Sequence, residues 1–290
     1  MKIKENVNSY MDKFVSIAKE LTTNTPTADE VSEVSPDMVD MMRPVVTGLK
    51  KYFRGEVTGL ENYPSEKALL VGNHNAGITF FEPFIMALEL YDKFPDDPIF
   101  FLTHDAMIAI PLLKNVLLKV GCIRASRETT KKALSMGHKV VVYPGGNYEA
   151  FRTYKERNIV DFGGKKGFIK IALEENVPIV PVANVGGHET FFVISSGHKL
   201  AEKIGVKKYL RSESFPIFLG LPWGIGFGPI FHLPLPTKLR IHIGEPISLE
   251  EYSAEDANDP EKLQEIYDIV IGKIQAIYDE LSANRKSIFS

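Results

Sequence analysis

The sequence contains a single cysteine, Cys122, and no long apolar run. One cysteine cannot form an internal disulfide, and it cannot supply the several thiolates of a zinc site. No run reaches the roughly 18 apolar residues that a membrane-spanning helix needs. Residues 1–20 carry too much charge for a signal peptide. We therefore expect no metal and a reducing, cytoplasmic location, with peripheral contact to the cytoplasmic face of a membrane left open.

The sequence also lacks an excess of charge of either sign. Its 34 Lys and Arg residues against 37 Asp and Glu residues give a net charge of -3, so no basic field exists to attract nucleic acid. Hydrophobic residues make up 44% of the 290 residues. This composition is typical of a globular protein, and a chain of this length can bury a substantial core. Nucleic acid is therefore not an expected partner.

Residues 1–54 are predicted to form an amphipathic helical appendage. Apolar residues recur at helical spacing between Val7 and Ala18 and again between Met38 and Tyr52, with a polar linker at 22–35. Such a pair of helices packs on a domain or dips into a bilayer interface.

Residues 55–290 are predicted to form one α/β domain with a mostly parallel central sheet flanked by helices, because strands and helices alternate. The expected strands are 67–72, 98–103, 121–124, 139–143, 179–182 and 239–243, and the expected helices are 83–92, 106–119, 127–137, 165–176 and 260–284.

A histidine follows the first buried strand. The apolar run 68–71 ends at Gly72, so Asn73 and His74 stand at the carboxyl end of the strand, where open α/β sheets bind ligands. Glu82 then opens the next helix with Pro83 behind it. His74 is a candidate general base, although a histidine here can also be a hydrogen-bonded structural residue.

Three later segments add polar groups at strand ends. Arg124 ends a short strand, and its planar guanidinium suits phosphate or carboxylate, or a surface ion pair. Gly145 and Gly146 follow the strand 139–143 and expose backbone N–H groups, with Glu149 and Arg152 just beyond. The fourth segment, Pro178–Val182, is a strand whose prolines are also typical of a sheet edge.

The order of these segments resembles the lysophospholipid and glycerolipid acyltransferases. That family shares an Asn-His motif, a Gly-x-x-Arg-like segment, a proline and glycine turn and a Val-Pro-Ile-Val-Pro strand, and the match covers about residues 55–250, with Gly244–Ile247 following the last strand. The family's usual acid five residues after the histidine is replaced by Thr79, and Glu82 stands eight residues after it. This spacing is nearer to the branch that includes the type-two diacylglycerol acyltransferases.

The resemblance implies an acyltransferase that moves a fatty acyl group from acyl-CoA or acyl carrier protein to the hydroxyl of a lysophospholipid or glycerolipid, with no cofactor besides the co-substrate. His74 would be the base and Glu82 its orienting acid, with Glu149 and Glu189 in reserve. Asn73, from the same motif as His74, and Glu149 would help to bind the substrate. Backbone N–H groups near Gly145 and Gly146 would hold the oxyanion, and Arg124 and Arg152 would bind phosphates or an acidic head group.

Other activities fit the sequence less well. No Gly-x-Ser-x-Gly elbow is present, and Cys122 lies in an apolar strand typical of a core residue. The remaining alternative is a non-catalytic protein that keeps the acyltransferase fold and binds lipid or an acyl carrier.

A membrane surface is the last expected partner. Residues 215–236 are apolar but interrupted by Gly and Pro, which predicts an apolar loop, and residues 198–211 form a predicted basic helix before it. This pair suits an anionic lipid surface, or equally a solvated helix beside a loop that caps the core.

Overall fold

The computed structural model describes residues 27–289 except 28, 75, 76, 78, 79, 191, 207–212, 231 and 284. The helix predicted between Val7 and Ala18, the position of Thr79 and the last part of the predicted basic helix lie outside the described residues.

A seven-stranded sheet forms the centre of the molecule in the order β1-β10-β6-β2-β5-β3-β4. The strands β6, β2, β5, β3 and β4 run parallel to their neighbours, whereas β10 is antiparallel to β6 and parallel to β1. The bounds are β1 Glu56–Thr58, β2 Leu69–Gly72, β3 Ile99–Thr103, β4 Cys122–Arg124, β5 Lys139–Val142, β6 Ile179–Val185 and β10 Arg240–Ile243. The predicted mostly parallel sheet is confirmed.

Strand β6 lies in the interior of the sheet, although its prolines suggested an edge position. The edge-strand interpretation of Pro178–Val182 is wrong, because β6 lies inside the sheet between β10 and β2. Pro181 stands opposite Val71 of β2 in this interior position. Its carbonyl accepts a hydrogen bond from Gly244 at 2.8 Å, so the strand keeps partners on both sides despite the missing N–H.

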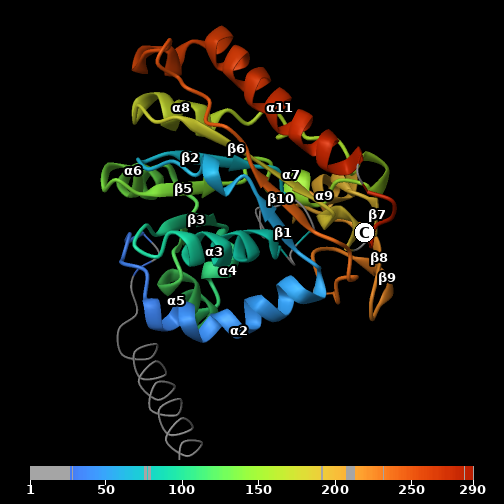
Figure 1. Ribbon diagram of the computed structural model, residues 1–290. Coiled ribbons are helices and arrows are strands. Elements are labelled where there is room, and N and C mark those ends of the chain that lie inside the picture. Colours follow the sequence, from blue (N-terminus) through green and yellow to red (C-terminus); the bar gives the residue numbers. More distant parts are fainter. Residues whose placement is uncertain are drawn as a thin grey trace, which may run out of the picture.

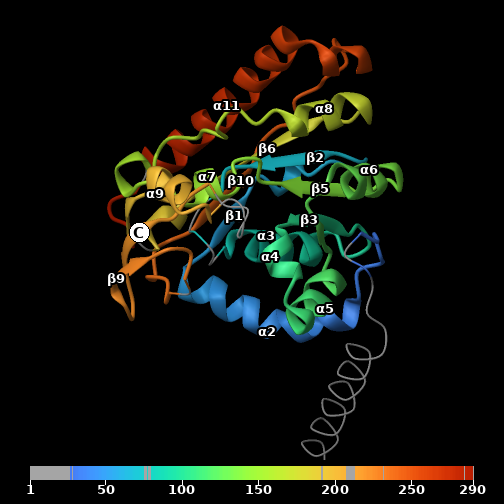
Figure 2. The same ribbon diagram turned by 180° about the vertical axis from the view of Figure 1, so that it is seen from behind.

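Helices cover both faces of this sheet (Figures 1 and 2). One face carries α6 Arg127–Ser135, α8 Gly167–Glu174 and α11 Pro260–Ala283, and the other carries α2 Pro36–Tyr52, α3 Glu82–Lys93, α4 Asp105–Ile108 and α5 Pro111–Lys119. Two hydrophobic clusters fill the space between the sheet and these layers, which gives a three-layer α/β/α arrangement. Within the described chain, none of the helices combines the length and the apolar character required to cross a bilayer.

The single helix predicted over 106–119 is two helices, because Pro111 takes the first position of α5 and Ile110 before it is extended. Helix α2 packs against α3 and α5 and buries Met38 and Val46. The boundary expected after residue 54 stays a prediction. Short elements link the larger ones: η1 Leu60–Asn62, α7 Asn147–Ala150, η2 Tyr154–Glu156, η3 Gly187–Glu189, α9 His198–Lys203 and η4 Ala254–Asn258.

The apolar loop predicted over 215–236 is wrong for much of its length, because two strands form there. A three-stranded antiparallel sheet joins β7 Phe192–Ser195, β8 Ile217–Gly220 and β9 Gly224–Phe227 at one end of the molecule (Figure 1). Gly226 stands opposite Phe218, and a methyl group on Gly226 would lie 2.3 Å from the Phe218 ring. The glycine that suggested a loop is thus required by close packing inside a strand pair.

Candidate functional site

Strand β2 brings His74 to the carboxyl end of the parallel sheet. β2 pairs with β5 on one side and β6 on the other, and its last residue is Gly72. A Cβ atom on Gly72 would lie 2.5 Å from the Tyr143 ring and 3.3 Å from the side-chain nitrogen of Asn184. Only glycine fits this close approach, so the chain leaves the strand with Asn73 and His74 pressed against the ends of β5 and β6.

Asn73 and Asn184 fix the end of β2 to β6. The Asn73 side chain donates to the Asn184 carbonyl at 2.8 Å and accepts the Asn184 N–H at 2.7 Å. The Asn184 side chain in turn donates to the Asn73 carbonyl at 2.9 Å. Both residues are buried, so these three bonds satisfy polar groups that would otherwise be costly to bury. Asn73 therefore supports the backbone that leads into His74.

The carboxylate of Glu149 accepts the backbone N–H of His74 at 2.8 Å. Glu149 belongs to α7, just after β5, and is 1% exposed. Burial raises the pKa of Glu149 to about 8, although its bonds with the backbones of His74 and Asp161 and the charge of Arg152 oppose that rise. Glu149 is thus predominantly protonated at neutral pH, and it acts on the main chain of His74.

His188 contacts the same backbone from β6's side of the site. It lies in η3, is buried, and forms a hydrogen bond with the backbone of His74. Burial, with smaller contributions from the charges of Arg152 and His74, lowers the pKa of His188 to about 3, although its bond to the His74 backbone opposes this change. The imidazole therefore stays neutral at physiological pH. Two buried side chains from different elements therefore hold the His74 main chain.

Aromatic rings surround the His74 imidazole. It stacks on Phe80 with ring centroids 4.1 Å apart, and its centroid lies 5.9 Å from that of Tyr143 in an edge arrangement. Burial, followed by the charge of Glu82, raises the pKa of the Tyr143 hydroxyl, so Tyr143 remains neutral. The imidazole itself is only half-buried, which leaves part of it accessible to a ligand.

Three carboxylates were expected as partners of His74, and the structure separates them. Glu82 is 1% exposed in the first turn of α3, where it accepts the Phe81 N–H at 3.1 Å and lies close enough to Tyr143 to affect its pKa. Glu82 is therefore near Tyr143, whose ring also contacts the His74 imidazole. Glu189 instead forms ion pairs with Arg285 at 2.5 Å and Arg157 at 3.7 Å, which direct its carboxylate to the C-terminal segment.

The glycine turn after β5 uses one of its two expected donors internally. Gly146 has a φ of +50° and donates its N–H to the Tyr143 carbonyl at 3.1 Å. The prediction that this N–H holds an oxyanion is therefore corrected, because the turn itself occupies the group. The Gly145 carbonyl accepts a bond from Lys165 at 2.7 Å, and a Cβ on Gly145 would lie 2.4 Å from the Glu149 carboxylate.

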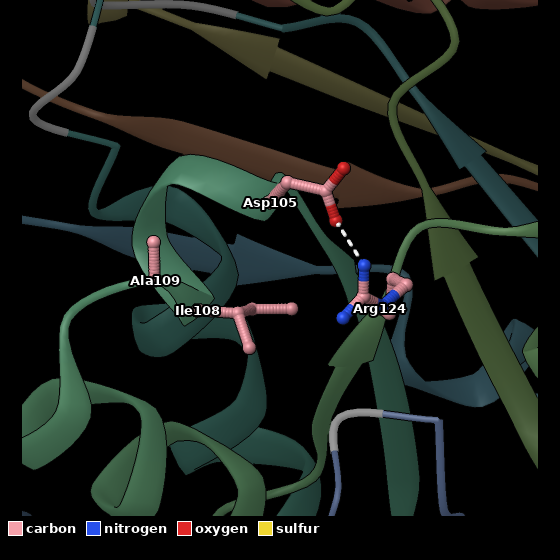
Figure 3. A pocket seen from close by; sticks show the side chains of 4 residues that line it. All are labelled: Asp105, Ile108, Ala109 and Arg124. Atoms are coloured by element: carbon pink, nitrogen blue, oxygen red, sulfur yellow. Dashed lines mark hydrogen bonds and ion pairs between the residues drawn. The ribbon is translucent and has the colours of Figure 1, made fainter.

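Arg124 lies apart from His74, at the edge strand β4. Figure 3 shows its guanidinium directed at Asp105, to which it donates at 2.9 Å, and a second pair joins it to Asp29 at 2.7 Å. A pocket of about 280 Å³ lies beside this pair. β4 is three strands from β2, which corresponds to about 14 Å. The structure shows Arg124 as an ion-paired residue at the sheet edge, and its role in binding phosphate stays a prediction.

Arg152 is buried rather than presented to a ligand. It donates to the Ile159 carbonyl and, at 2.7 Å, to the Asp161 carbonyl, and its guanidinium lies 5.9 Å from the Tyr148 ring centroid. Its predicted role in binding phosphate is therefore corrected to fixing the segment 159–161 next to Glu149. Cys122 is buried as expected, and burial raises the pKa of its thiol to about 11, which leaves no nucleophilic thiolate at neutral pH.

A groove of about 370 Å³ opens between α6 and α8 at the same end of the sheet. Its floor is apolar and includes Leu69, Val142 and Phe168. Three cationic residues line it: Arg127, which also pairs with Glu174, Lys165 and Lys170. Pro144 of the glycine turn also lines it, so the groove ends next to the segment that carries Glu149.

Sequence reasoning missed Tyr143, Asn184 and His188. Tyr143 was present in the quoted strand end, and Asn184 interrupts an otherwise apolar strand, which is a readable signal. His188 stands in a Gly-Gly-His-Glu segment about 110 residues after His74, and spacing alone does not reveal their contact. Among the described residues, no group of three or more His, Cys, Asp or Glu side chains is arranged to hold a metal ion.

Comparison with known proteins identifies the family. The family model for diacylglycerol acyltransferase matches residues 30–287. An uncharacterized protein of Mycobacterium leprae is 32% identical over 241 residues, which cover 83% of this chain and 63% of that protein. Diacylglycerol O-acyltransferase 2 of Dictyostelium discoideum is 26% identical over 239 residues, which cover 80% of this chain and 71% of that protein.

The fold also resembles a solved structure. The 1-acyl-sn-glycerophosphate (LPA) acyltransferase PlsC from Thermotoga maritima superposes with a TM-score of 0.51 at 17% identity, covering 86% of this chain and 82% of that one. The chain spans less than two thirds of the length of the mycobacterial relatives that it matches. Because the family model matches nearly the whole described chain, this chain belongs to the diacylglycerol acyltransferase family.

Proposed function

We propose that this protein transfers a fatty acyl group from a thioester, acyl-CoA or acyl carrier protein, to the hydroxyl of a lipid acceptor. Membership in the diacylglycerol acyltransferase family supports the reaction class. The observation that carries the proposal is the double support of His74, whose backbone is bonded by Glu149 and by His188 while its ring stays half-buried between aromatic side chains. Such support suits a side chain that must stay oriented during a reaction.

In the proposed reaction, His74 takes the proton of the acceptor hydroxyl as its oxygen attacks the thioester carbonyl. The C–S bond then breaks, the thiolate takes the proton from His74, and the products are an ester and a free thiol. No acyl-enzyme forms. We assign Glu82 as the acid that orients the imidazole, since its charge acts on Tyr143 and the Tyr143 ring contacts His74. We assign Glu149 and His188 as residues that position the main chain.

The oxyanion of the tetrahedral intermediate needs a donor near His74. Because the Gly146 N–H is used within its turn, we assign this role to the Gly145 N–H. It lies in the same turn, next to Glu149. Preorganised backbone donors of this kind stabilise the developing negative charge without reorganisation.

We assign the acyl donor to the groove between α6 and α8. Its apolar floor suits an alkyl chain or the pantetheine arm, and Lys165, Lys170 and Arg127 suit phosphates. Arg127 also pairs with Glu174 and Lys165 also donates to the Gly145 carbonyl, but these cations line the groove, whereas Arg124 and Arg152 lie outside its lining. The acceptor is a glycerolipid, with a neutral diacylglycerol favoured over a phosphate-bearing lysophospholipid, because neither expected arginine is presented next to His74.

The test compares the purified protein with its His74→Ala variant on long-chain acyl-CoA and a panel of lipid acceptors, following thiol release and identifying products by mass spectrometry. Loss of an oriented base lowers the rate by about 10²- to 10⁴-fold. His242→Ala is the matched control, because His242 is a half-buried histidine on β10 that contacts Thr58. Wild-type turnover in His74→Ala would refute the assignment of His74. Lipid binding without any turnover in the wild type would favour the non-catalytic binding protein instead.

A further inference from the structure

The small sheet of β7, β8 and β9 is apolar on both faces. Its inner face carries Val193 and Phe218, which pack against Phe151 beside α7. The outward positions carry Ile194, Leu219, Ile225 and Phe227, which are 49% to 61% exposed. An antiparallel sheet with one solvated face normally places polar residues at such positions. This outer face therefore has a composition that suits an apolar environment.

The register gathers these side chains into one patch. Leu219 stands directly opposite Ile225, and Phe227 stands opposite Ile217. Leu221 and Trp223, at the turn between β8 and β9, are 55% and 56% exposed and extend the patch beyond the strand ends. Contiguous exposed apolar patches of this kind mark interaction sites in soluble domains.

Charge is excluded from the patch and positive at its border. Residues 214–236 contain no Asp, Glu, Lys or Arg. The sequence of residues 198–213, between β7 and β8, contains five Lys and Arg residues against Glu202 and Glu213, so this segment is basic overall. Within it, helix α9 carries exposed Lys199, Glu202 and Lys203, and its first residue, His198, contacts the Glu213 carbonyl next to β8. An apolar surface bordered by cations complements an anionic bilayer surface.

We propose that the outer face of this small sheet docks into the interfacial region of a bilayer, with α9 at its basic border. A protein partner would require hydrogen-bonding groups spread over the interface, and the outward positions of β8 and β9 offer none from side chains. Docking stops at interfacial depth, because β7 and β9 are sheet edges whose outer backbone groups need water or head groups as partners. The inference deepens the proposed function by assigning how a lipid acceptor reaches this end of the molecule.

Vesicle flotation of the full chain tests the docking without requiring turnover. The variant Leu219→Thr/Ile225→Thr/Phe227→Thr removes exposed apolar area and places threonine, a β-branched residue that suits strands, at each position. We expect it to lower the partition onto phosphatidylcholine–phosphatidylglycerol vesicles by about 10-fold or more. Ile110→Thr is the matched control, because Ile110 is 52% exposed on α5's side of the molecule. Trp223→Ser, at the turn, provides a second variant should the triple variant not fold.

A change of lipid head group, or of the lysines on α9, tests whether the basic border of the patch contributes to binding. The variant Lys199→Gln/Lys203→Gln should weaken binding to the anionic vesicles by about 5-fold for each lysine removed. Replacing phosphatidylglycerol by phosphatidylcholine should weaken the binding of the wild type as well, because it removes the anionic head groups. The docking proposal is overturned if the triple variant floats like the wild type, if the wild type ignores vesicles, or if light scattering shows a wild-type dimer that the triple variant loses. His74→Ala should float normally, so failure of the proposed chemistry and failure of docking are distinguishable.

Discussion

Burial of Glu149 should make the protein less stable as pH rises, because it favours the protonated form of the Glu149 carboxyl in the folded state. Burial raises the pKa of this carboxyl to about 8 in the folded protein, against 4.5 for a glutamate exposed to water. The folded state therefore binds more protons than the unfolded state between these values, and the protein loses stability as pH rises through that window. The stabilisation from the bound proton is complete below pH 4.5 and is lost as pH passes 8.

The size of the effect follows from the two pKa values. Between pH 6 and pH 8 the contribution of this one group falls by about 2 kcal/mol. The variant Glu149→Gln resembles the protonated carboxyl in shape, and its amide oxygen can still accept the His74 N–H. We expect Glu149→Gln to match the wild type below pH 4.5, and we expect its advantage in the free energy of unfolding to grow by about 2 kcal/mol between pH 6 and pH 8.

Urea unfolding of both proteins at pH 6, 7 and 8 measures this difference. Glu250→Gln, at an exposed position on the surface, should keep the wild-type dependence on pH. Parallel stability curves for the wild type and Glu149→Gln across the range would refute the protonated state of Glu149. Destabilisation of Glu149→Gln at every pH would show that the carboxylate form is the one that the fold requires.

Two further predictions concern the site. Gly72→Ala should lower the free energy of unfolding by about 1–3 kcal/mol, because the added methyl group would overlap the Tyr143 ring. Thermal unfolding checks this against Gly48→Ala, whose added methyl group meets open space on α2 and should be neutral or slightly stabilising. If the groove between α6 and α8 binds the donor, Lys170→Glu should raise KM for acyl-CoA with little change in kcat. Lys132→Glu, on the exposed side of α6, should leave KM unchanged, and steady-state kinetics with varied acyl-CoA measures both variants.

The sequence predicted the central sheet well because its strands are short apolar runs that end at glycines and polar residues. The run 68–71 and the strand 139–143 are buried on both faces in β2 and β5, and such strands are recognised without any alternation. The same runs predicted where His74 and the glycine turn would lie, since parallel strands end at one edge of a sheet. Helical spacing of apolar residues also predicted α2, and the alternation of strands and helices predicted α3 and α11.

The contacts of the site could not be predicted in the same way. The side-chain bond that Arg152 makes to the Asp161 carbonyl and the ion pair of Arg124 with Asp29 depend on how separate segments pack, and a strand-end arginine looks the same in the sequence whether or not it is paired. The role of Glu149 toward the His74 backbone was missed for a similar reason. The acyltransferase motif predicts a carboxylate that contacts the imidazole, whereas Glu149 bonds the main chain of His74.

The strands β8 and β9 of the small sheet were not predicted, because their sequence departs from the alternation of apolar and polar residues that identifies a strand. Outward residues such as Leu219 and Ile225 are as apolar as the inward Phe218, and glycine fills the inward position opposite that ring. The pattern thus loses its period where both faces avoid polar side chains. A strand of this kind is favoured only when its outer face is covered or meets an apolar phase, so the failure of the sequence pattern and the exposed patch have one physical cause.

Packing connects this patch with the candidate site. Phe218 of the inner face contacts Phe151, which directly follows the helix that carries Glu149, and Glu149 bonds the backbone of His74. A bilayer that supports the outer face would therefore bring its lipids to the end of the molecule where His74 lies. In this arrangement, loss of the patch should impair turnover of long-chain acceptors embedded in vesicles, whereas turnover of short-chain acceptors dissolved in water should persist, since the supports of His74 lie on the inner side of the sheet.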